Sequence, residues 1–250
     1  MNRSIPIFLA FALCAPAQDP RQIVQEAQRR GYARSQRYEG NLKVIAATER
    51  VTEKRWQYDR IGSFGDSKTV LRFLDPPEVK GVALLVFNYK NRASDQWMWT
   101  PALQRERRIA LQDRSTRFFG TDFSFEDLEE REAEHFEFRL LGEEKLDGYD
   151  CWKLESRPRP TRTSQYTHSQ LWIRKDNYAY LRVDAFQKDT LFRRILYRDL
   201  QELEGIWTAR HIEVFDVKRN SRTVLKLDKI DYNVPVKEED FTLQALRRGS

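Results

Sequence analysis

Short runs of alternating apolar and polar residues follow one another along most of this chain, and they constrain its fold more than any other feature. Leu42 and Val44 share one face of the first run. Trp56 and Tyr58 share one face of the next. Charged turn residues such as 188–189 separate the runs at a spacing of roughly 10–12 residues, which is typical of hairpins. Parallel strands need crossover connections of about a dozen residues or more, which such turns do not provide. The sequence therefore predicts about a dozen or slightly more strands in one large antiparallel sheet, strongly curved or nearly closed.

Helical patterns are rare. Residues 19–31 begin with Asp19 as a candidate N-cap and end with Gly31, and Ile23 lies on an apolar face between them. We expect a short amphipathic helix there, lying on the sheet. A second, weaker helical insertion is expected within residues 113–133.

The 250 residues contain no linker and no low-complexity segment, so one domain over residues 18–250 is the simplest interpretation. Hydrophobic residues make up 40% of the chain and charged residues 33%, which is polar but sufficient for a core. The formal net charge is +6, and basic residues are interleaved with acidic ones. This pattern favours a solvated mixed-charge surface and argues against nucleic-acid binding.

Residues 1–17 have the pattern of a secretory signal peptide. Arg3 precedes an apolar run that ends in Ala-Pro-Ala, so cleavage is expected before Gln18. The run is shorter than the ~20 residues that span a bilayer. We therefore expect an exported, periplasmic protein. Cys14 permits an alternative, lipid anchoring, but a lipoprotein signal usually has a small residue where this chain has Leu13.

Sequence motifs for catalysis or metal binding are missing. The histidines, His135, His168 and His211, lie far apart without a second ligand at helical or hairpin spacing. The chain has no glycine-rich phosphate loop and no hydrolase or metalloprotease motif. Once Cys14 is removed, Cys151 has no disulfide partner, and its neighbour Trp152 suggests that the thiol is buried. We expect a protein that is not an enzyme and that has neither a cofactor nor a metal.

Two apolar strands stand out. Residues 82–87, Val-Ala-Leu-Leu-Val-Phe, are apolar on both faces, whereas a strand of a one-faced antiparallel sheet has a polar side. One face should pack on a helix, and the other, with Leu84 and Val86, should face an interior filled by side chains or by a ligand. In the next strand Trp97 and Trp99 share a face, which suits either a core or a pocket for acyl chains.

Residues 113–130, Asp-Arg-Ser-Thr-Arg-Phe-Phe-Gly-Thr-Asp-Phe-Ser-Phe-Glu-Asp-Leu-Glu-Glu, show neither a helical nor a strand period. They nevertheless carry four phenylalanines, which must be buried in the protein itself, in a partner or in a ligand. These are Phe118, Phe119, Phe123 and Phe125.

The stretch Lys80–Leu128 resembles the LolA-like family of outer-membrane lipoprotein-sorting proteins. In that family a strand with a Lys-Gly start is followed by a strand of the form D-x-W-x-Y-x-P-A-L, paired arginines, and F-x-G-(S/T)-D-F-(S/T)-Y-E-D-L. This sequence departs at Trp99 and Phe125, where tyrosine is commoner. The matching residues are Gly81, Asp95, Trp97, Pro101, Ala102, Leu103, Arg107, Arg108, Ser115, Phe119, Gly120, Asp122, Phe123, Glu126, Asp127 and Leu128.

The resemblance implies a mainly β fold, an unclosed LolA/LolB-like half-barrel formed by a large curved antiparallel sheet with a few covering helices. It also implies a function, the binding of acyl chains of a lipid or lipoprotein in an apolar interior and their transport across the periplasm toward the outer membrane. Family members are often associated with exporters of the resistance–nodulation–division type, which implies an inner-membrane partner. We expect the protein to be a monomer.

We further expect residues 113–130 to act as a lid whose phenylalanines close over the cavity. Gly120 would let the backbone turn. Arg107 and Arg108 would latch the lid through its carboxylates or would meet a lipid phosphate. The alternative is a permanent plug, in which the same aromatics fill the barrel. The latch carboxylates would be Asp122, Glu126 and Asp127.

Two other functions are open to a chain of this kind. One is a periplasmic sensor or interaction module of the same fold that regulates a membrane protein and transports no ligand. The other is an enzyme, which would need convergent polar groups in the cavity. The sequence contains no added domain that would hold it to a fixed partner, which favours the carrier.

Overall fold

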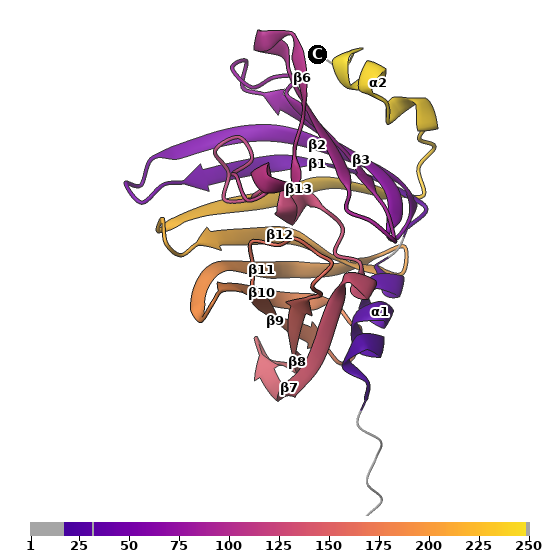
Figure 1. Ribbon diagram of the computed structural model, residues 1–250, viewed down its shortest axis with the longest axis vertical. Coiled ribbons are helices and arrows are strands. Elements are labelled where there is room, and N and C mark those ends of the chain that lie inside the picture. The colour runs from indigo at the N-terminus through magenta and orange to yellow at the C-terminus, as the bar shows by residue number, and fades with distance from the viewer. Residues whose placement is uncertain (1–17, 32, 249–250) are drawn as a thin grey trace, which may run out of the picture.

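The computed structural model describes residues 18–31 and 33–248. The expected signal peptide and Cys14 lie outside the described residues. Figure 1 shows one large curved sheet with helices at its margins. The sheet has 13 strands, its neighbouring strands are antiparallel, and its two edge strands are not paired with each other. This confirms the predicted fold class.

The chain contains two α-helices, α1 (Pro20–Arg30) and α2 (Leu243–Arg248), in the described residues. The strands are β1 (Ser35–Ile45), β2 (Val51–Ser63), β3 (Asp66–Asp75), β4 (Ala83–Asn88), β5 (Asp95–Thr100), β6 (Arg105–Arg108), β7 (Phe136–Leu146), β8 (Tyr149–Pro158), β9 (His168–Arg174), β10 (Tyr180–Gln187), β11 (Thr190–Leu203), β12 (Ile206–Asp216) and β13 (Ser221–Tyr232).

The strand order determines where the phenylalanine-rich stretch must run. The order is β6-β5-β4-β3-β2-β1-β13-β12-β11-β10-β9-β8-β7. The chain therefore starts at the centre, reaches one edge at β6, and resumes at the opposite edge with β7. Residues 109–135, here called the crossover segment, connect the two edges and lie over one face of the sheet (Figure 1). We call this the inner face and the opposite one the outer face.

Helix α1 forms where the sequence predicts it. The Asp19 side chain accepts a hydrogen bond from the Arg21 backbone N–H at 3.0 Å, and Pro20 occupies the first turn. Ile23 and Val24 are buried, and they pack on inner-face residues of β8 to β10. The helix thus covers the part of the inner face near β7.

Strand β4 is covered on both faces, as its sequence predicts. On the outer face Ala83 and Leu85 pack with Phe241 and Leu246 from the C-terminal segment that contains α2. On the inner face its apolar residues meet the crossover segment. The sequence does not predict α2, because six residues provide too little helical period.

The predicted helical insertion within residues 113–133 is wrong. The crossover segment contains only single 3₁₀ turns, at Leu111–Asp113, Glu126–Leu128 and Ala133–His135. Its chain reverses at Phe119 and Gly120, which have φ angles of +43° and +74° and so cannot continue a right-handed helix. The Phe118 backbone N–H instead donates to the Phe123 carbonyl at 2.8 Å.

Candidate functional site

A cavity of about 460 Å³ lies on the inner face, between α1, the end of the crossover segment, strands β7 to β13 and strand β1. Its volume falls within the ~300–1,000 Å³ that is usual for small-molecule sites. The walls are mainly apolar and aromatic. Among the lining residues are Val24, Phe136, Phe138, Leu171, Val183, Ile195 and Ile212, together with five tyrosines: Tyr38, Tyr178, Tyr180, Tyr197 and Tyr232.

Three of the cavity tyrosines, Tyr38, Tyr180 and Tyr197, remain protonated at neutral pH because burial raises their pKa values. Burial raises the pKa of Tyr197 to about 12. Burial also raises the pKa values of Tyr38 and Tyr180 above their ordinary value. The Tyr38 hydroxyl lies 3.1 Å from that of Tyr232, which also contacts the Thr208 hydroxyl. These three tyrosines therefore supply neutral hydroxyl groups to a mainly apolar space.

A buried ion pair fixes the end of the crossover segment that reaches this cavity. Asp127 pairs with Arg193 of β11, and both side chains are buried. The second oxygen of the Asp127 carboxylate accepts a hydrogen bond from the Tyr166 hydroxyl at 2.8 Å. The Ser124 backbone N–H and hydroxyl each donate to Asp127 at 2.6 Å. The carboxylate is thus saturated by donors from three parts of the chain.

Glu129 forms a second anchor. Its buried carboxylate accepts hydrogen bonds from Arg114 at 2.6 Å, from Gln96 at 2.9 Å and from Arg162 at 3.2 Å. Glu130 makes a third anchor, because it pairs with Arg60 of β2 at 2.6 Å. Several separate partners hold the acidic run in place.

The carboxylates nearer the phenylalanines are also satisfied. Asp122 accepts hydrogen bonds from Arg117 at 2.9 Å, from Ser221 at 2.6 Å and from Thr223 at 2.7 Å. Glu126 accepts one from the backbone N–H of Gln165 at 2.9 Å. In the described part of the chain, no group of three or more histidine, cysteine, aspartate and glutamate side chains is placed to hold a metal ion.

Several solved structures superpose on this protein over most of its chain. A family model described only as that of an uncharacterized protein matches residues 65–248. A domain named as an outer membrane lipoprotein-sorting protein domain, from Vibrio parahaemolyticus, superposes with a TM-score of 0.87 at 27% identity and covers 92% of this chain and 98% of its own. The chain belongs to the family of that model, and its fold is that of the LolA-like outer-membrane lipoprotein-sorting proteins that its sequence resembles.

Two further structures share the fold of this LolA-like chain. A DUF1329 family protein from Desulfovibrio piger has a TM-score of 0.87 at 26% identity, over 92% of this chain and 100% of that one. A LolA superfamily protein from Nitrosomonas europaea has a TM-score of 0.71 at 18% identity, over 92% of this chain and 100% of that one, and it shows the fold alone. No curated protein matches the sequence.

The residues that the sequence suggested as ligand-binding do not line the cavity of this LolA-like chain. Leu84, Val86, Phe118 and Phe125 lie in a buried cluster with Phe73, under the other half of the inner face. They are core residues because the crossover segment is pressed directly onto β3 and β4. Phe119 packs at the margin of this cluster, and Phe123 is half-buried outside the cavity lining.

The two tryptophans share a face, as predicted, but it is the outer face. Trp97 and Trp99 pack with Leu85 and with Leu246 of α2. A strand alternates its side chains between two faces, and its sequence cannot tell which face is the interior. Met98, between the two tryptophans, is the residue that points to the crossover segment.

The predicted latch pairs are wrong. Arg108 pairs with Asp95 at 2.5 Å, and Arg107 lies 4.0 Å from Asp113. Both arginines lie on the edge strand β6, where the register with β5 places Arg108 opposite Trp97 and near Asp95. Other arginines, Arg117 and Arg193, pair with the carboxylates that were expected to form the latch. Gly120 does provide the predicted turn. Of the candidate site residues predicted from the sequence, Asp127 is the one that lines the cavity within the described chain.

The residues that line the cavity are harder to identify from the sequence than the phenylalanines of the crossover segment. Tyr180 and Val183 of β10 and Ile195 and Tyr197 of β11 face the same side of the sheet. Ile195 and Tyr197 follow the period-two pattern that most strands share. Tyr180 and Val183 lie three positions apart and face the same side because the register shifts between Tyr180 and Arg182, which the sequence pattern does not reveal. Cys151 is buried, as its neighbour suggested, and it packs on the outer face with Trp172.

Proposed function

We propose that this LolA-like protein is a periplasmic carrier that binds acyl chains of a lipid or lipoprotein and moves them toward the outer membrane. The observation that carries the proposal is the cavity of about 460 Å³ under α1, with its mainly apolar lining. The printed name of the Vibrio parahaemolyticus relative, an outer membrane lipoprotein-sorting protein domain, supports the same role.

Packing in such a cavity supplies enough free energy for binding. Each buried methylene contributes ~0.8 kcal/mol, so ten of them contribute about 8 kcal/mol. This is the free energy of a roughly micromolar complex, before the cost of association is subtracted. The proposed role requires no catalytic group, cofactor or metal.

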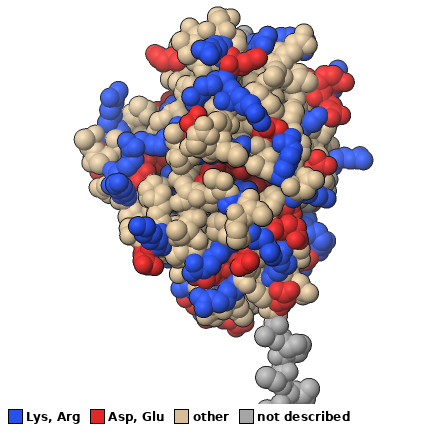
Figure 2. All heavy atoms as spheres, viewed as in Figure 1, with Lys and Arg blue, Asp and Glu red and all other residues tan. Residues whose placement is uncertain are grey.

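The location and partners are part of the proposal. Residues 1–17 would direct export and be removed, and the mature domain would be residues 18–250. No helix in the described residues is long and apolar enough to cross a membrane. The carrier would receive its ligand from an inner-membrane exporter of the resistance–nodulation–division type. Figure 2 shows basic and acidic side chains interspersed on one face of the molecule, in keeping with a partner other than nucleic acid.

The decisive experiment is native mass spectrometry of residues 18–250 purified gently from the periplasm of the source organism. We expect a stoichiometric acyl-containing species, which extraction would then identify. An empty protein that also takes up neither a fluorescent fatty acid nor a phospholipid would contradict the carrier. Crosslinking to a membrane protein would then test the interaction-module alternative.

A further inference from the structure

One charged side chain of the cavity differs from the others. Four charged residues line the cavity, and three of them have partners of opposite charge. These pairs are Arg30–Glu26, Arg193–Asp127 and Arg114–Glu129. The fourth is Arg131, for which the described residues provide no carboxylate at ion-pairing distance. A cation beside apolar walls without a counter-charge is unfavourable unless water or a ligand completes it.

Two contacts hold Arg131 in place without using the N–H donors of its guanidinium group. The Gln28 side chain of α1 donates to the Arg131 backbone carbonyl at 2.8 Å. The guanidinium lies over the Phe136 ring, 4.6 Å from its centroid. Stacking uses the flat face of a guanidinium, whereas its five N–H donors point outward in the plane. These donors are thus available to an acceptor in the cavity.

Two cavity hydroxyls are also without partners. Tyr38 and Tyr232 bond each other, but the hydroxyls of Tyr180 and Tyr197 make no hydrogen bond to any described residue. The rings of Tyr180 and Tyr197 are 6.3 Å apart. Burial raises the pKa of each tyrosine, and the positive charge of Arg131 acts against that rise at both. Arg131 is therefore an electrostatic neighbour of both hydroxyls.

We propose that Arg131, Tyr180 and Tyr197 form the polar end of the cavity and bind the acidic headgroup, a carboxylate or phosphate, of an acyl ligand. The inference rests on the proposed function, because it names the class of ligand that the same cavity takes. A planar guanidinium and two neutral hydroxyls match an oxyanion, to which charge-assisted hydrogen bonds are short and strong. The remaining walls would hold the chain.

The test compares palmitate with 1-hexadecanol, which has the same chain without the charge, on residues 18–250 by displacement of a fluorescent fatty acid. We expect wild type to bind palmitate about tenfold more tightly, as a hydrogen bond to a charged group implies. Arg131→Met should abolish that preference and leave 1-hexadecanol binding unchanged. The matched control is Arg139→Met, which removes the same charge from an exposed side chain on the outer face of β7, next to Phe138, and should keep the preference.

Equal binding of the two probes by wild type, or a preference retained in Arg131→Met, would overturn the inference. Neither result would contradict the proposed carrier function. Binding of neither probe would overturn the proposed function itself. If Arg131→Met does not fold, Tyr180→Phe with Tyr197→Phe removes only the two hydroxyls and should weaken palmitate more than 1-hexadecanol. Dodecyl phosphate against dodecanoate distinguishes the two headgroups. Displacement by inorganic phosphate alone, without a chain, would show an anion site unrelated to lipid and would also overturn the inference.

Discussion

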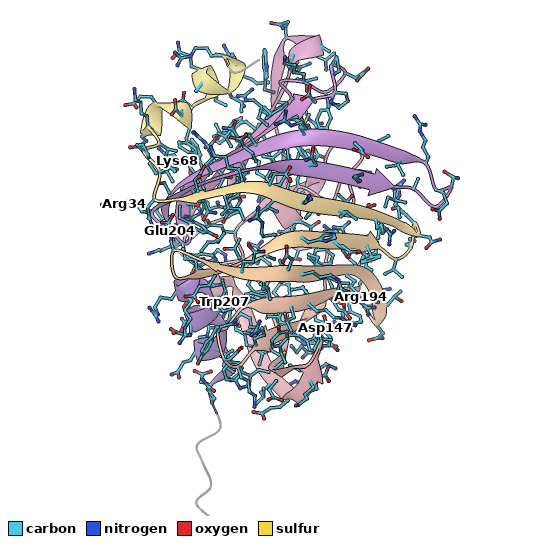
Figure 3. All side chains as sticks on the ribbon, turned by 180° about the vertical axis from the view of Figure 1, so that it is seen from behind. Arg34, Lys68, Asp147, Arg194, Glu204 and Trp207 are labelled. Atoms are coloured by element: carbon cyan, nitrogen blue, oxygen red, sulfur yellow. The ribbon has the colours of Figure 1, made fainter. Side chains whose placement is uncertain are left out.

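Arg193 lies within β11 with a side chain that is 2% exposed, and it reaches the crossover segment on the inner face. It contacts Asp127 and the Tyr166 hydroxyl. Arg194, the next residue, points to the outer face and pairs with Asp184 at 2.8 Å (Figure 3). Neighbouring arginines on one strand thus have different structural roles. One anchors a segment that crosses the sheet, and the other joins two adjacent strands.

Breaking the buried pair should cost far more than breaking an exposed one. Arg193→Met leaves Asp127 charged and buried, and we expect the free energy of unfolding to fall by about 3–5 kcal/mol. Arg108→Met is the control, because its side chain is 68% exposed and its loss should cost about 1 kcal/mol or less. Urea denaturation measures both. Similar losses in the two variants would show that Arg193 does not anchor the segment.

His135 should make stability depend on pH. Burial, followed by the charge of Arg162, lowers the pKa of His135, and its Nδ1 is buried without a hydrogen-bond partner in the described chain. The unfolded chain therefore takes up a proton near its ordinary pKa of about 6.5 before the folded protein does. Stability is lost as pH falls through this window and is unaffected above it.

Replacement by glutamine removes this contribution. We expect the urea midpoint of wild type to fall between about pH 7.5 and pH 5.5, and that of His135→Gln to fall less. A pH dependence that is identical in wild type and His135→Gln would contradict the assignment to His135.

Among the elements, the crossover segment packs over half of the inner face. Phe118 is buried, and its ring stacks on that of Phe73 with centroids 5.4 Å apart. Phe125 meets Phe118 edge to face at 5.7 Å. With its carboxylates anchored on several strands, we propose that the segment stays in place while ligand enters the other half. The lid hypothesis would require these contacts to open.

Phe118→Ala distinguishes a plug from a lid. Truncating a buried phenylalanine should lower the free energy of unfolding by about 3–5 kcal/mol. Acyl uptake should be unchanged, because the ring does not line the cavity. Uptake is measured with a fluorescent fatty acid at a temperature where the variant is folded. A marked loss of uptake with little loss of stability would favour the lid.

At the scale of the whole molecule, one curved sheet supports two different interiors. The half made by β1 to β6 is filled by aromatic residues of the crossover segment, whereas the half beneath α1 keeps a cavity. The curvature has a local cause at Gly40, where the register with β13 shifts and a Cβ would lie 2.0 Å from the Lys226 carbonyl oxygen. Only glycine allows the two strands to approach so closely there.

A large side chain in the cavity should prevent acyl-chain binding without unfolding the protein. Ala209 of β12 lines the cavity, so the phenyl group of Ala209→Phe would occupy space that the ligand needs. We expect at least about tenfold weaker acyl uptake and a stability loss of no more than about 1–3 kcal/mol. The control is Ala102→Phe at an exposed position outside the cavity. Unchanged uptake in Ala209→Phe would place the ligand elsewhere.

Local patterns in the sequence suffice to predict the kind of sheet and to show the resemblance to the LolA-like proteins. Its period-two runs and short turns allow only antiparallel neighbours, and the caps at Asp19 and Gly31 define α1. The stretch Lys80–Leu128 carried the resemblance to the LolA-like proteins, although its Phe118 and Phe125 pack in the core and do not line the cavity. These features depend on interactions between residues close in the chain, which local patterns reveal.

Long-range packing determines which face of each strand is the inner one and which arginines pair with the acidic run. It also determines where the sheet and α1 leave a cavity. Trp97 points away from the interior and Tyr197 toward it, yet both lie in similar alternating runs. Arg193 and Asp127 are 66 positions apart and meet because the chain crosses from one sheet edge to the other. Alternation along a strand is symmetric between its two faces, so the choice between them comes from long-range packing.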